Sequence, residues 1–424
     1  MTDTELLVYL DLEGQPQVVG RLWSRARKGR ESATFEYDRS WLKHPARFAL
    51  EPALVLSHGP QHTASGRRIF GAIGDSAPDR WGRLLIQREE RRKAREAKRE
   101  PHTLNEVDYL IAVGDVARQG ALRFAQKEEG PFLADGVQIP PLVRLTALLD
   151  ASLRLAADGG TDEDLRLLLA PGSSLGGARP KASIIDDRDG HLAIAKFPKD
   201  DDLIPVIQWE ATALSLAAKA GIPTPEWRIE KVGQRQVLLL RRFDRVKEHR
   251  IPFLSAMSML DAQDNDQRSY MEIADALRQY GAKPEEDCAQ LWRRIVFSIL
   301  ISNSDDHLRN HGFLYDSTGG WRLAPAYDLN PVPLDIKPRI LTTAIDEADG
   351  TASLDLAFAV AEHFGLKPDN ARKIASEVGN AVKNWRQTAK TRGLSVDQIN
   401  RMVSAFEHKE LEQATSGTDQ IIGR

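Results

Sequence analysis

The amino-acid sequence predicts an α+β fold with two lobes and an additional, smaller α/β subdomain at the N-terminus. Two observations carry this prediction. Residues 182–198 contain two short apolar runs around a polar turn, a pattern typical of a β-hairpin. From Ser269 onwards apolar residues recur at helical spacing, and breaks containing glycine or proline separate the segments. We therefore expect a strand-containing lobe followed by a mainly helical one.

A helix and a hairpin are expected on either side of a polar loop in the second lobe. Leu291, Ile295 and Ile299 recur every four residues, which predicts a buried helix leading into residues 302–310. Two strand-like runs then flank the turn residues 317–320. The order of helix, polar loop, hairpin and acidic loop is that of the C-terminal lobe of a protein kinase.

Three polar residues in these loops have the spacing of a kinase active site. Asp305 precedes Asn310 by five positions, and Asp328 follows the expected hairpin. In protein kinases such an Asp accepts the hydroxyl proton, whereas the Asn and the later Asp hold Mg²⁺. An amide and a carboxylate suffice, because Mg²⁺ prefers oxygen ligands and keeps several waters. The spacing predicts phosphoryl transfer with ATP and Mg²⁺; the alternative for such short motifs is a turn or helix cap.

Candidates for binding the phosphates lie earlier in the chain. Residues 171–181 form a loop with several small residues, which let backbone N–H groups approach phosphate oxygens, although the loop fits neither G-x-G-x-x-G nor G-x-x-x-x-G-K-[ST]. Lys196 ends the run Ala-Ile-Ala-Lys, close to the V-A-I-K strand of kinases. Glu210 is the only carboxylate of the helix expected over 206–220 and is the predicted partner of Lys196. The alternatives are a solvated lysine and an exposed glutamate.

Taken together, these motifs resemble the HipA family of bacterial Ser/Thr kinases, the toxins of type II toxin–antitoxin modules. The resemblance extends over nearly the whole chain, because the N-terminal part is similar to the small N-terminal subdomain of the family. The segments that carry it are 8–10, 35–37, 118–124, 174–181, 195–198, 242–245, 303–310 and 327–329.

The resemblance implies roles for individual residues. Asp305 would be the catalytic base, Asn310 and Asp328 the Mg²⁺ ligands, and Lys196 a contact to the ATP phosphates. Ser174 would be autophosphorylated, with Ser173 and Ser183 as alternatives; the added charge of roughly −1.5 to −2 would repel the ATP phosphates and eject the loop. The full set expected at the nucleotide is Ser174, Gly176, Gly177, Ala178, Lys181, Lys196, Glu210, Arg241, Phe243 and His307.

The resemblance also implies partners. Family members phosphorylate protein substrates that include aminoacyl-tRNA synthetases, and they pair with a helix-turn-helix antitoxin of HipB type that binds operator DNA. Contact with DNA is therefore expected only through the antitoxin. Departures from ordinary protein kinases concern regulation: Ser304 replaces the Arg of H-R-D, Leu329 and Asn330 replace the Phe-Gly of D-F-G, and no A-P-E follows. Regulation is expected through the Ser174 loop, and Arg241, at the expected hinge, should leave adenine contacts to the main chain.

Composition and length agree with a globular, cytoplasmic protein. The 424 residues are 42% hydrophobic and 28% charged, with a net charge of −3 that gives no general attraction to nucleic acid. A buried thiol is expected at the single Cys288, and no long apolar segment predicts a membrane span. We expect an N-terminal subdomain at 1–130, a kinase N-lobe at 131–245, a helical C-lobe at 246–413 and a flexible tail at 414–424.

Other readings of the sequence remain open. The chain could be an ATP-binding scaffold with weak catalysis that acts through an antitoxin–DNA complex, or a metal-dependent hydrolase built on Asp305, Asp306 and His307. The charged run 87–100 could bind nucleic acid, although its alternating signs favour a solvated helix with internal ion pairs. Residues 360–368 have the character of a helix-turn-helix, for which a turn between packed core helices is the favoured interpretation.

Overall fold

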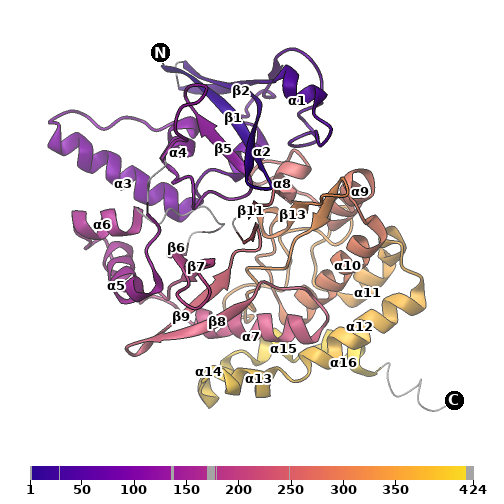
Figure 1. Cartoon of the computed structure of the whole chain (residues 1–424). Helices are drawn as coiled ribbons and strands as arrows, with labels where there is room; N and C mark the ends of the chain where they lie inside the picture. Colours follow the sequence, from indigo (N-terminus) through magenta and orange to yellow (C-terminus); the bar gives the residue numbers. More distant parts are fainter. Residues whose placement is uncertain are drawn as a thin grey trace. The chain divides into compact units, whose positions relative to one another are not determined.

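The computed structural model describes residues 2–27, 29–134, 138–169, 177, 179–247 and 249–416. Contacts divide the chain into two compact units. Unit 1 comprises Met1–Asp201 and Ile229–Leu254, and unit 2 comprises Asp202–Arg228 and Ser255–Arg424 (Figure 1). This grouping differs from the predicted limits at 130 and 245, because both predicted N-terminal parts contribute to unit 1 and the helix that carries Glu210 belongs to unit 2. The predicted division therefore stays a prediction.

Unit 1 begins with a five-stranded antiparallel sheet of order β4-β3-β2-β1-β5. Side chains alternate across β3, where Ala33, Phe35 and Tyr37 are buried and their neighbours are more exposed, as expected when one face covers a core. Four helices accompany the sheet. The bounds are β1 (Thr2–Leu12), β2 (Gln15–Arg27), β3 (Arg30–Tyr37), β4 (Gln61–His62), β5 (Leu122–Ala125), α1 (Arg39–Lys43), α2 (Gly71–Asp75), α3 (Arg80–Glu96) and α4 (Glu106–Ala112).

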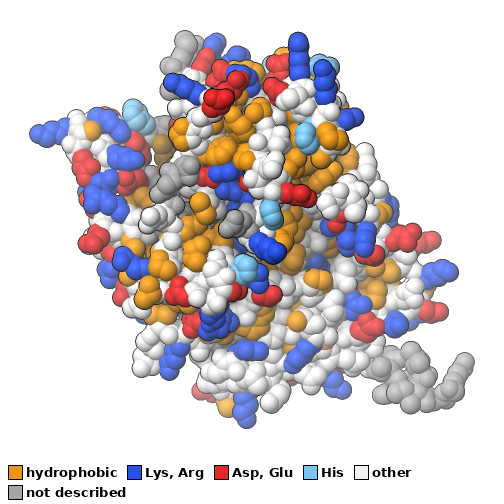
Figure 2. Space-filling model, in the orientation of Figure 1, with side chains coloured by type: hydrophobic (Ala, Val, Ile, Leu, Met, Phe, Trp, Pro, Cys, Tyr) orange, Lys and Arg blue, Asp and Glu red, His pale blue; other side chains and the backbone are white. Residues whose placement is uncertain are grey.

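The charged run forms most of α3, whose basic and acidic side chains are interspersed on the surface (Figure 2). Arg92 pairs with Glu89 and Glu96 on the same helix, and Lys93 also pairs with Glu89. Arg88 donates to the carbonyl of Leu155 at 2.7 Å. The ion pairs confirm the predicted helix with internal ion pairs. The Arg88 contact also connects α3 to the neighbouring helix that contains Leu155.

A second sheet in unit 1 has the order β6-β7-β9-β8 and contains the predicted hairpin. Leucines on α5 and α6 pack with Trp81, Ile184 and Leu239 in one buried cluster, so the helical pair covers one face of this sheet. The bounds are η1 (Leu142–Arg144), α5 (Leu145–Ala156), α6 (Asp162–Leu169), β6 (Lys181–Ile185), β7 (Leu192–Lys196), β8 (Trp227–Val232), β9 (Arg235–Arg241), β10 (Arg245–Val246) and β11 (His249–Arg250).

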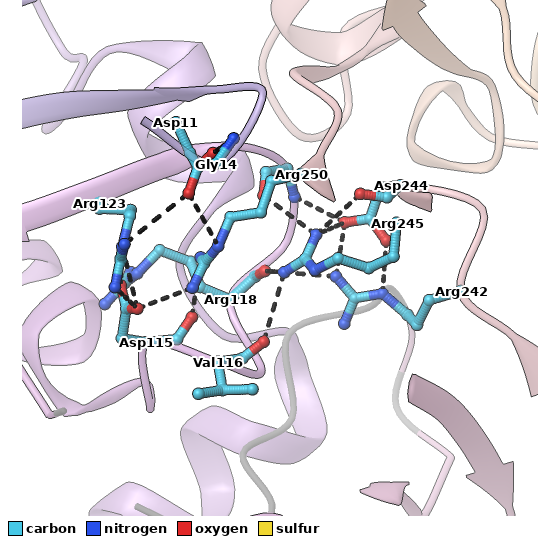
Figure 3. A network of polar contacts seen from close by, with 11 residues as sticks. Asp11, Gly14, Asp115, Val116, Arg118, Arg123, Arg242, Asp244, Arg245 and Arg250 are labelled. Atoms are coloured by element: carbon cyan, nitrogen blue, oxygen red, sulfur yellow. Dashed lines mark hydrogen bonds and ion pairs between the residues drawn. The ribbon is translucent and has the colours of Figure 1, made fainter. Parts of the chain in front are cut away.

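A buried network of arginines and aspartates ties residues 242–250 to the N-terminal part of unit 1 (Figure 3). Asp244 accepts from the backbone N–H of Gly120 at 2.7 Å and from the guanidinium of Arg245 at 2.8 Å. Burial opposes ionisation of Asp244, but the charges of Arg242 and Arg245 outweigh it and hold its pKa well below the usual range. Burial lowers the pKa of Arg245 to about 9. The charged residues of the network are Asp11, Asp115, Arg118, Arg123, Arg242, Asp244, Arg245 and Arg250.

Unit 2 is mainly helical, and α10 is buried along most of its length. The indole of Trp292 on α10 donates to the carbonyl of Ala357 at 3.0 Å. The predicted helix and the predicted hairpin that follows it are both confirmed. The bounds are α7 (Val206–Lys219), β12 (Phe253–Ser255), α8 (Ala256–Met259), α9 (Tyr270–Tyr280), α10 (Pro284–Ile301), η2 (Leu308–Asn310), β13 (Gly312–Tyr315), β14 (Trp321–Leu323), α11 (Leu354–Ala359), η3 (Ala361–Phe364), α12 (Pro368–Val382), α13 (Trp385–Thr391), α14 (Val396–Arg401), α15 (Val403–Phe406) and α16 (Lys409–Ser416).

Three shorter features of unit 2 are the thiol of Cys288, the segment η3 and the end of α16. Cys288 is buried and burial raises the pKa of its thiol, which confirms the expected buried position. Ala361 and Phe364 of η3 are buried, so this segment belongs to the core. Residues 414–416 were expected in a flexible tail but continue α16, because the small Gly379 lets α12 approach Ala414 closely. In the part of the chain that the structure describes, no helix combines the length and apolar character needed to cross a bilayer.

Candidate active site

The polar loop after α10 leaves the helix in a fixed direction. Ser302 caps α10 in the left-handed conformation, with φ of 54°, which is uncommon for a residue other than glycine. Its hydroxyl donates to the carbonyl of Ala405 at 2.8 Å, and the Arg339 guanidinium donates to that hydroxyl and to the carbonyl of Ile299. Because side chains from distant parts of unit 2 hold this strained position, the loop is positioned rigidly.

The adjacent carboxylates Asp305 and Asp306 have different surroundings. Asp306 is 3% exposed and accepts hydrogen bonds from the Tyr270 hydroxyl and, at 3.0 Å, from the Ser298 hydroxyl. His311 Nε2 lies 2.9 Å from its Oδ1. Burial opposes ionisation of Asp306, but the charge of His311 and these hydrogen bonds lower its pKa. Asp306 therefore holds the loop in place.

Asp305 instead presents its carboxylate to solvent. Its side chain is 67% exposed, and Lys337 Nζ lies 3.5 Å from its Oδ1. A proton acceptor must come within hydrogen-bonding distance of its substrate, and the exposed carboxylate of Asp305 meets that requirement. The buried Asp306, whose oxygens are already engaged, does not. This difference also removes one of the three groups required by the hydrolase alternative.

Asn310 has the arrangement expected of a metal ligand. Its amide nitrogen donates to the carbonyl of Asp305 at 3.0 Å, which fixes the orientation of the side chain. The opposite atom, Oδ1, is buried and accepts no hydrogen bond from any described residue. A buried acceptor without a donor costs about 1–3 kcal/mol, a cost that a water molecule or a cation can remove. The residue therefore fits a magnesium site.

Asp328 lies in a loop that is bonded directly to the polar loop 302–310. Asp328 adopts a left-handed conformation, with φ of 58°. Before it, the Tyr327 hydroxyl donates to the carbonyl of Arg309 at 2.7 Å; after it, the Asn330 backbone N–H donates to Asn303 Oδ1 at 3.2 Å. Since these bonds reach the neighbours of Asn310 and Asp305, unit 2 brings all three predicted residues into one region. An oxygen pair from Asn310 and Asp328 suits Mg²⁺.

Sequence reasoning assigned no role to several residues that organise this region. Asn303, Tyr327 and Asn330 connect the two loops, and Asn330 Nδ2 also lies 3.1 Å from Asp328 Oδ1. Lys337 contacts the predicted base. Asn303, Tyr327 and Asn330 lie inside or beside the recognised motifs, so their sequence positions could have indicated a role at the site. Lys337 lies in a later, irregular segment, where no sequence pattern indicates such a role. His307 is partly buried, and its Nδ1 is buried without a partner among the described residues.

The predicted lysines are in unit 1. Lys196 ends β7 and is 8% exposed, so the solvated-lysine alternative is wrong. Lys181 is its direct partner in the antiparallel β6–β7 register, which places both side chains on the same face. Lys181 Nζ donates to Asp79 Oδ2 at 2.7 Å, and both side chains are 3% exposed. Asp79 also caps α3 by accepting from the Gly82 backbone N–H. The buried Asp79 thus neutralises the charge of Lys181.

The other residues expected at the nucleotide are divided between the two units, and some lie outside the described residues. Glu210 is 1% exposed in α7, so the exposed-glutamate alternative is wrong; because Glu210 belongs to unit 2 and Lys196 to unit 1, their pairing stays a prediction. Arg241 ends β9, with Nη2 2.6 Å from His191 Nε2, and the ring of Phe243 lies 6.3 Å from that of Phe253. Gly177 has φ of 95°. Ser173, Ser174, Gly176 and Ala178 lie outside the described residues, and Ser183 is buried in β6.

Taken together, the α+β architecture and the two bonded loops of unit 2 define a kinase-like fold. Sequence models agree: the one described as the HipA-like C-terminal domain matches residues 173–385, and the one described as the HipA N-terminal domain matches residues 10–125. The chain belongs to the HipA family.

Curated relatives and a solved structure are also similar to this chain. Y4mE, a Sinorhizobium fredii protein named as a kinase, is 26% identical over 357 residues, which cover 74% of this chain and 78% of Y4mE. A Haemophilus influenzae protein named as a kinase is 25% identical over 214 residues, covering 44% of this chain and 62% of its own length. In structure, the chain is similar to a chain from the HipA, HipB and operator DNA complex of Shewanella oneidensis MR-1. The TM-score is 0.66 and the identity 17%, over 99% of this chain and 97% of that one.

Proposed function

We propose that this protein is an ATP- and Mg²⁺-dependent serine/threonine protein kinase of the HipA type. One observation carries the proposal: unit 2 combines an exposed carboxylate at Asp305, a buried and unsatisfied amide oxygen at Asn310, and Asp328 on a loop bonded to both of their neighbours. These are the groups that phosphoryl transfer requires, because that reaction depends on positioning and on neutralising charge rather than on covalent catalysis. The kinase names of the relatives support the same conclusion.

The residues would divide the reaction between them. Asp305 orients the acceptor hydroxyl and takes its proton as the new P–O bond forms and the bond to ADP breaks. Asn310 and Asp328 would hold Mg²⁺, which neutralises phosphate charge when bound. Lys196 would contact the phosphates, and Glu210 would orient Lys196. The proposal therefore requires Lys196 and the Asp305 loop to face the same nucleotide.

We extend the proposal to regulation and partners. Autophosphorylation of Ser174 would place negative charge in the loop that cradles the ATP phosphates and thereby weaken ATP binding. A helix-turn-helix antitoxin of HipB type would be the partner, with DNA contacted through it, and the substrate would be a cytoplasmic protein such as an aminoacyl-tRNA synthetase. Family membership and the fold shared with HipA of the Shewanella complex support the antitoxin.

Intact-mass measurement after incubation with Mg·ATP tests the activity and the modified serine together. The wild-type protein should gain one phosphate, and peptide mapping should place it on Ser174. Asp305→Asn should slow the gain by at least about 10²-fold, the lower range for a positioned proton acceptor. Omitting Mg²⁺ is the matched control. A wild-type protein that transfers no phosphate to itself or to candidate synthetases would favour the scaffold alternative, and full activity of Asp305→Asn would remove that residue from the mechanism.

A further inference from the structure

Lys337 contacts the catalytic loop from a segment outside every recognised motif. Its ammonium group donates to the carbonyl of Ser304 at 3.1 Å and lies 3.5 Å from Asp305 Oδ1. The side chain is 41% exposed, and the Asp305 carboxylate is 67% exposed. The cation and the candidate base therefore meet where both can be reached from solvent.

The backbone around Lys337 is held firmly. The N–H groups of Ile336 and Lys337 both donate to the carbonyl of Pro333, which closes a short turn. The Leu334 N–H donates to the Ser404 hydroxyl at 3.0 Å. This turn begins five residues after Asp328. A short segment therefore connects the candidate metal ligand Asp328 to Lys337, which contacts the candidate base Asp305. The position of Lys337 is thus fixed by the backbone, while its four-carbon side chain retains freedom to move.

The neighbouring arginines are committed to other contacts. Arg309 forms an ion pair with Asp264, and both side chains are exposed. Arg339 donates to Ser302 and Ile299, and burial lowers the pKa of its guanidinium. Within the part of the chain that the structure describes, Asp305 forms its ion pair with Lys337. Lys337 is therefore the cation best placed to act beside the base.

We propose that Lys337 is a catalytic residue whose ammonium group binds the phosphoryl group as it passes to the acceptor hydroxyl. An acceptor hydroxyl lies about 2.6–3.2 Å from its base, so the phosphorus that it attacks comes within reach of a lysine beside Asp305. The transition state of phosphoryl transfer spreads negative charge over the phosphate oxygens, and a cation aimed at them stabilises it strongly. Ser304, immediately before Asp305, is uncharged, so the cation beside the base comes from another segment.

The contact with Asp305 alone would not require this role. A partly exposed ion pair contributes only about 0–1 kcal/mol to stability, so the pair has little value as a structural support. A second alternative is that Lys337 only adjusts the proton affinity of Asp305. In that case its removal would shift the pH dependence of the rate and leave the maximal rate at higher pH unchanged.

The test, which rests on the proposed kinase activity, compares Lys337→Met and Lys337→Arg with Lys373→Met, an exposed lysine of α12. Phosphotransfer with Mg·ATP should show kcat reduced by at least about 10²-fold in Lys337→Met, a modest share of the effect known for arginine fingers, with KM for ATP little changed. Lys337→Arg should recover part of the rate, and Lys373→Met should match the wild type. Thermal unfolding of each variant verifies that the fold is retained.

A binding measurement gives a second readout that does not depend on turnover. ADP with Mg²⁺ and aluminium fluoride mimics the transferring phosphoryl group, and transition-state analogues report contacts that are made during transfer. Lys337→Met should weaken this complex by about 10²-fold and leave ADP affinity unchanged.

The outcomes separate the two proposals. An unchanged kcat, an unchanged analogue affinity, or a rate loss that disappears at higher pH would overturn the role of Lys337 while leaving the kinase assignment intact. Absence of phosphotransfer by the wild-type protein would overturn both.

Discussion

At the scale of single residues, burial distinguishes the roles of two neighbouring carboxylates. Asp305 and Asp306 are chemically equivalent in the sequence, yet one is 67% exposed and the other 3% exposed. The five-residue spacing to Asn310 selected Asp305 rather than Asp306 as the candidate base, and Asp305 is the accessible carboxylate of the two. Lys337 could not be found in this way, since its position depends on a turn whose partners are Pro333 and the distant Ser404.

Replacing Asp306 by Asn should destabilise the protein by about 1–3 kcal/mol, because the buried carboxylate that accepts hydrogen bonds from Tyr270 and Ser298 is lost. Denaturant unfolding measures this change, and Asp305→Asn should remain within about 0.5 kcal/mol of the wild type. The folded pKa of Asp306 is lowered, so its stabilising contribution is present above the ordinary carboxyl pKa of about 3.9 and disappears as pH falls through the folded value. Equal stability of both variants at neutral pH would contradict this assignment.

At the scale of elements, long periodic segments were predictable and short ones were not. The helix over α10 and the hairpins β6–β7 and β13–β14 follow from clear periodicity and turn residues. The helices α1, α2 and α4, with five to seven residues each, are too short to show a helical period, and the sequence indicated only one helix in this region. Aromatic packing between α7, α13 and α15 was also missed, since it joins residues far apart in the chain.

Trp385→Ala should destabilise unit 2 by about 3–5 kcal/mol, the usual cost of removing a large buried aromatic side chain. Trp385 stacks on Phe406 with ring centres 4.5 Å apart and contacts Trp209 at 6.2 Å, so the substitution opens a cavity between three helices. Denaturant unfolding provides the measurement. Trp227→Ala is a suitable control because Trp227 is only partly buried, and it should cost less. A larger loss at Trp227 would show that this aromatic cluster does not support α7.

At the scale of the whole molecule, the sequence predicted an α+β kinase-like chain of the HipA family, and that prediction is confirmed. It placed a domain boundary near residue 130, whereas contacts group residues on both sides of it in unit 1. Part of the reason is the ion network: Asp115 accepts from Arg250 at 2.7 Å, and Gly120 donates to Asp244. Such pairings between distant arginines and aspartates have no periodic signature in the sequence.

A chain lacking residues 1–125 should therefore fail to fold. The truncation removes the acceptors of Arg242, Arg245 and Arg250 that lie in the N-terminal part, and buried charges left without partners cost several kcal/mol each. Circular dichroism and thermal unfolding of residues 126–424 test this expectation, with the full chain as reference. A cooperative transition at the temperature of the full chain would contradict it.

The network of Figure 3 also limits how this protein can be recombined with its relatives. Consider a chimera that takes its first 125 residues from one homologue and the rest from another. Its buried hydrogen-bond donors and acceptors then come from two different proteins and need not pair with each other. A chimera should fold only when Asp115 and Gly120 come from the same parent as Asp244 and Arg250, because these residues bond to each other. We therefore expect functional chimeras to take residues 115–120 and the segment with Asp244 and Arg250 from the same parent protein.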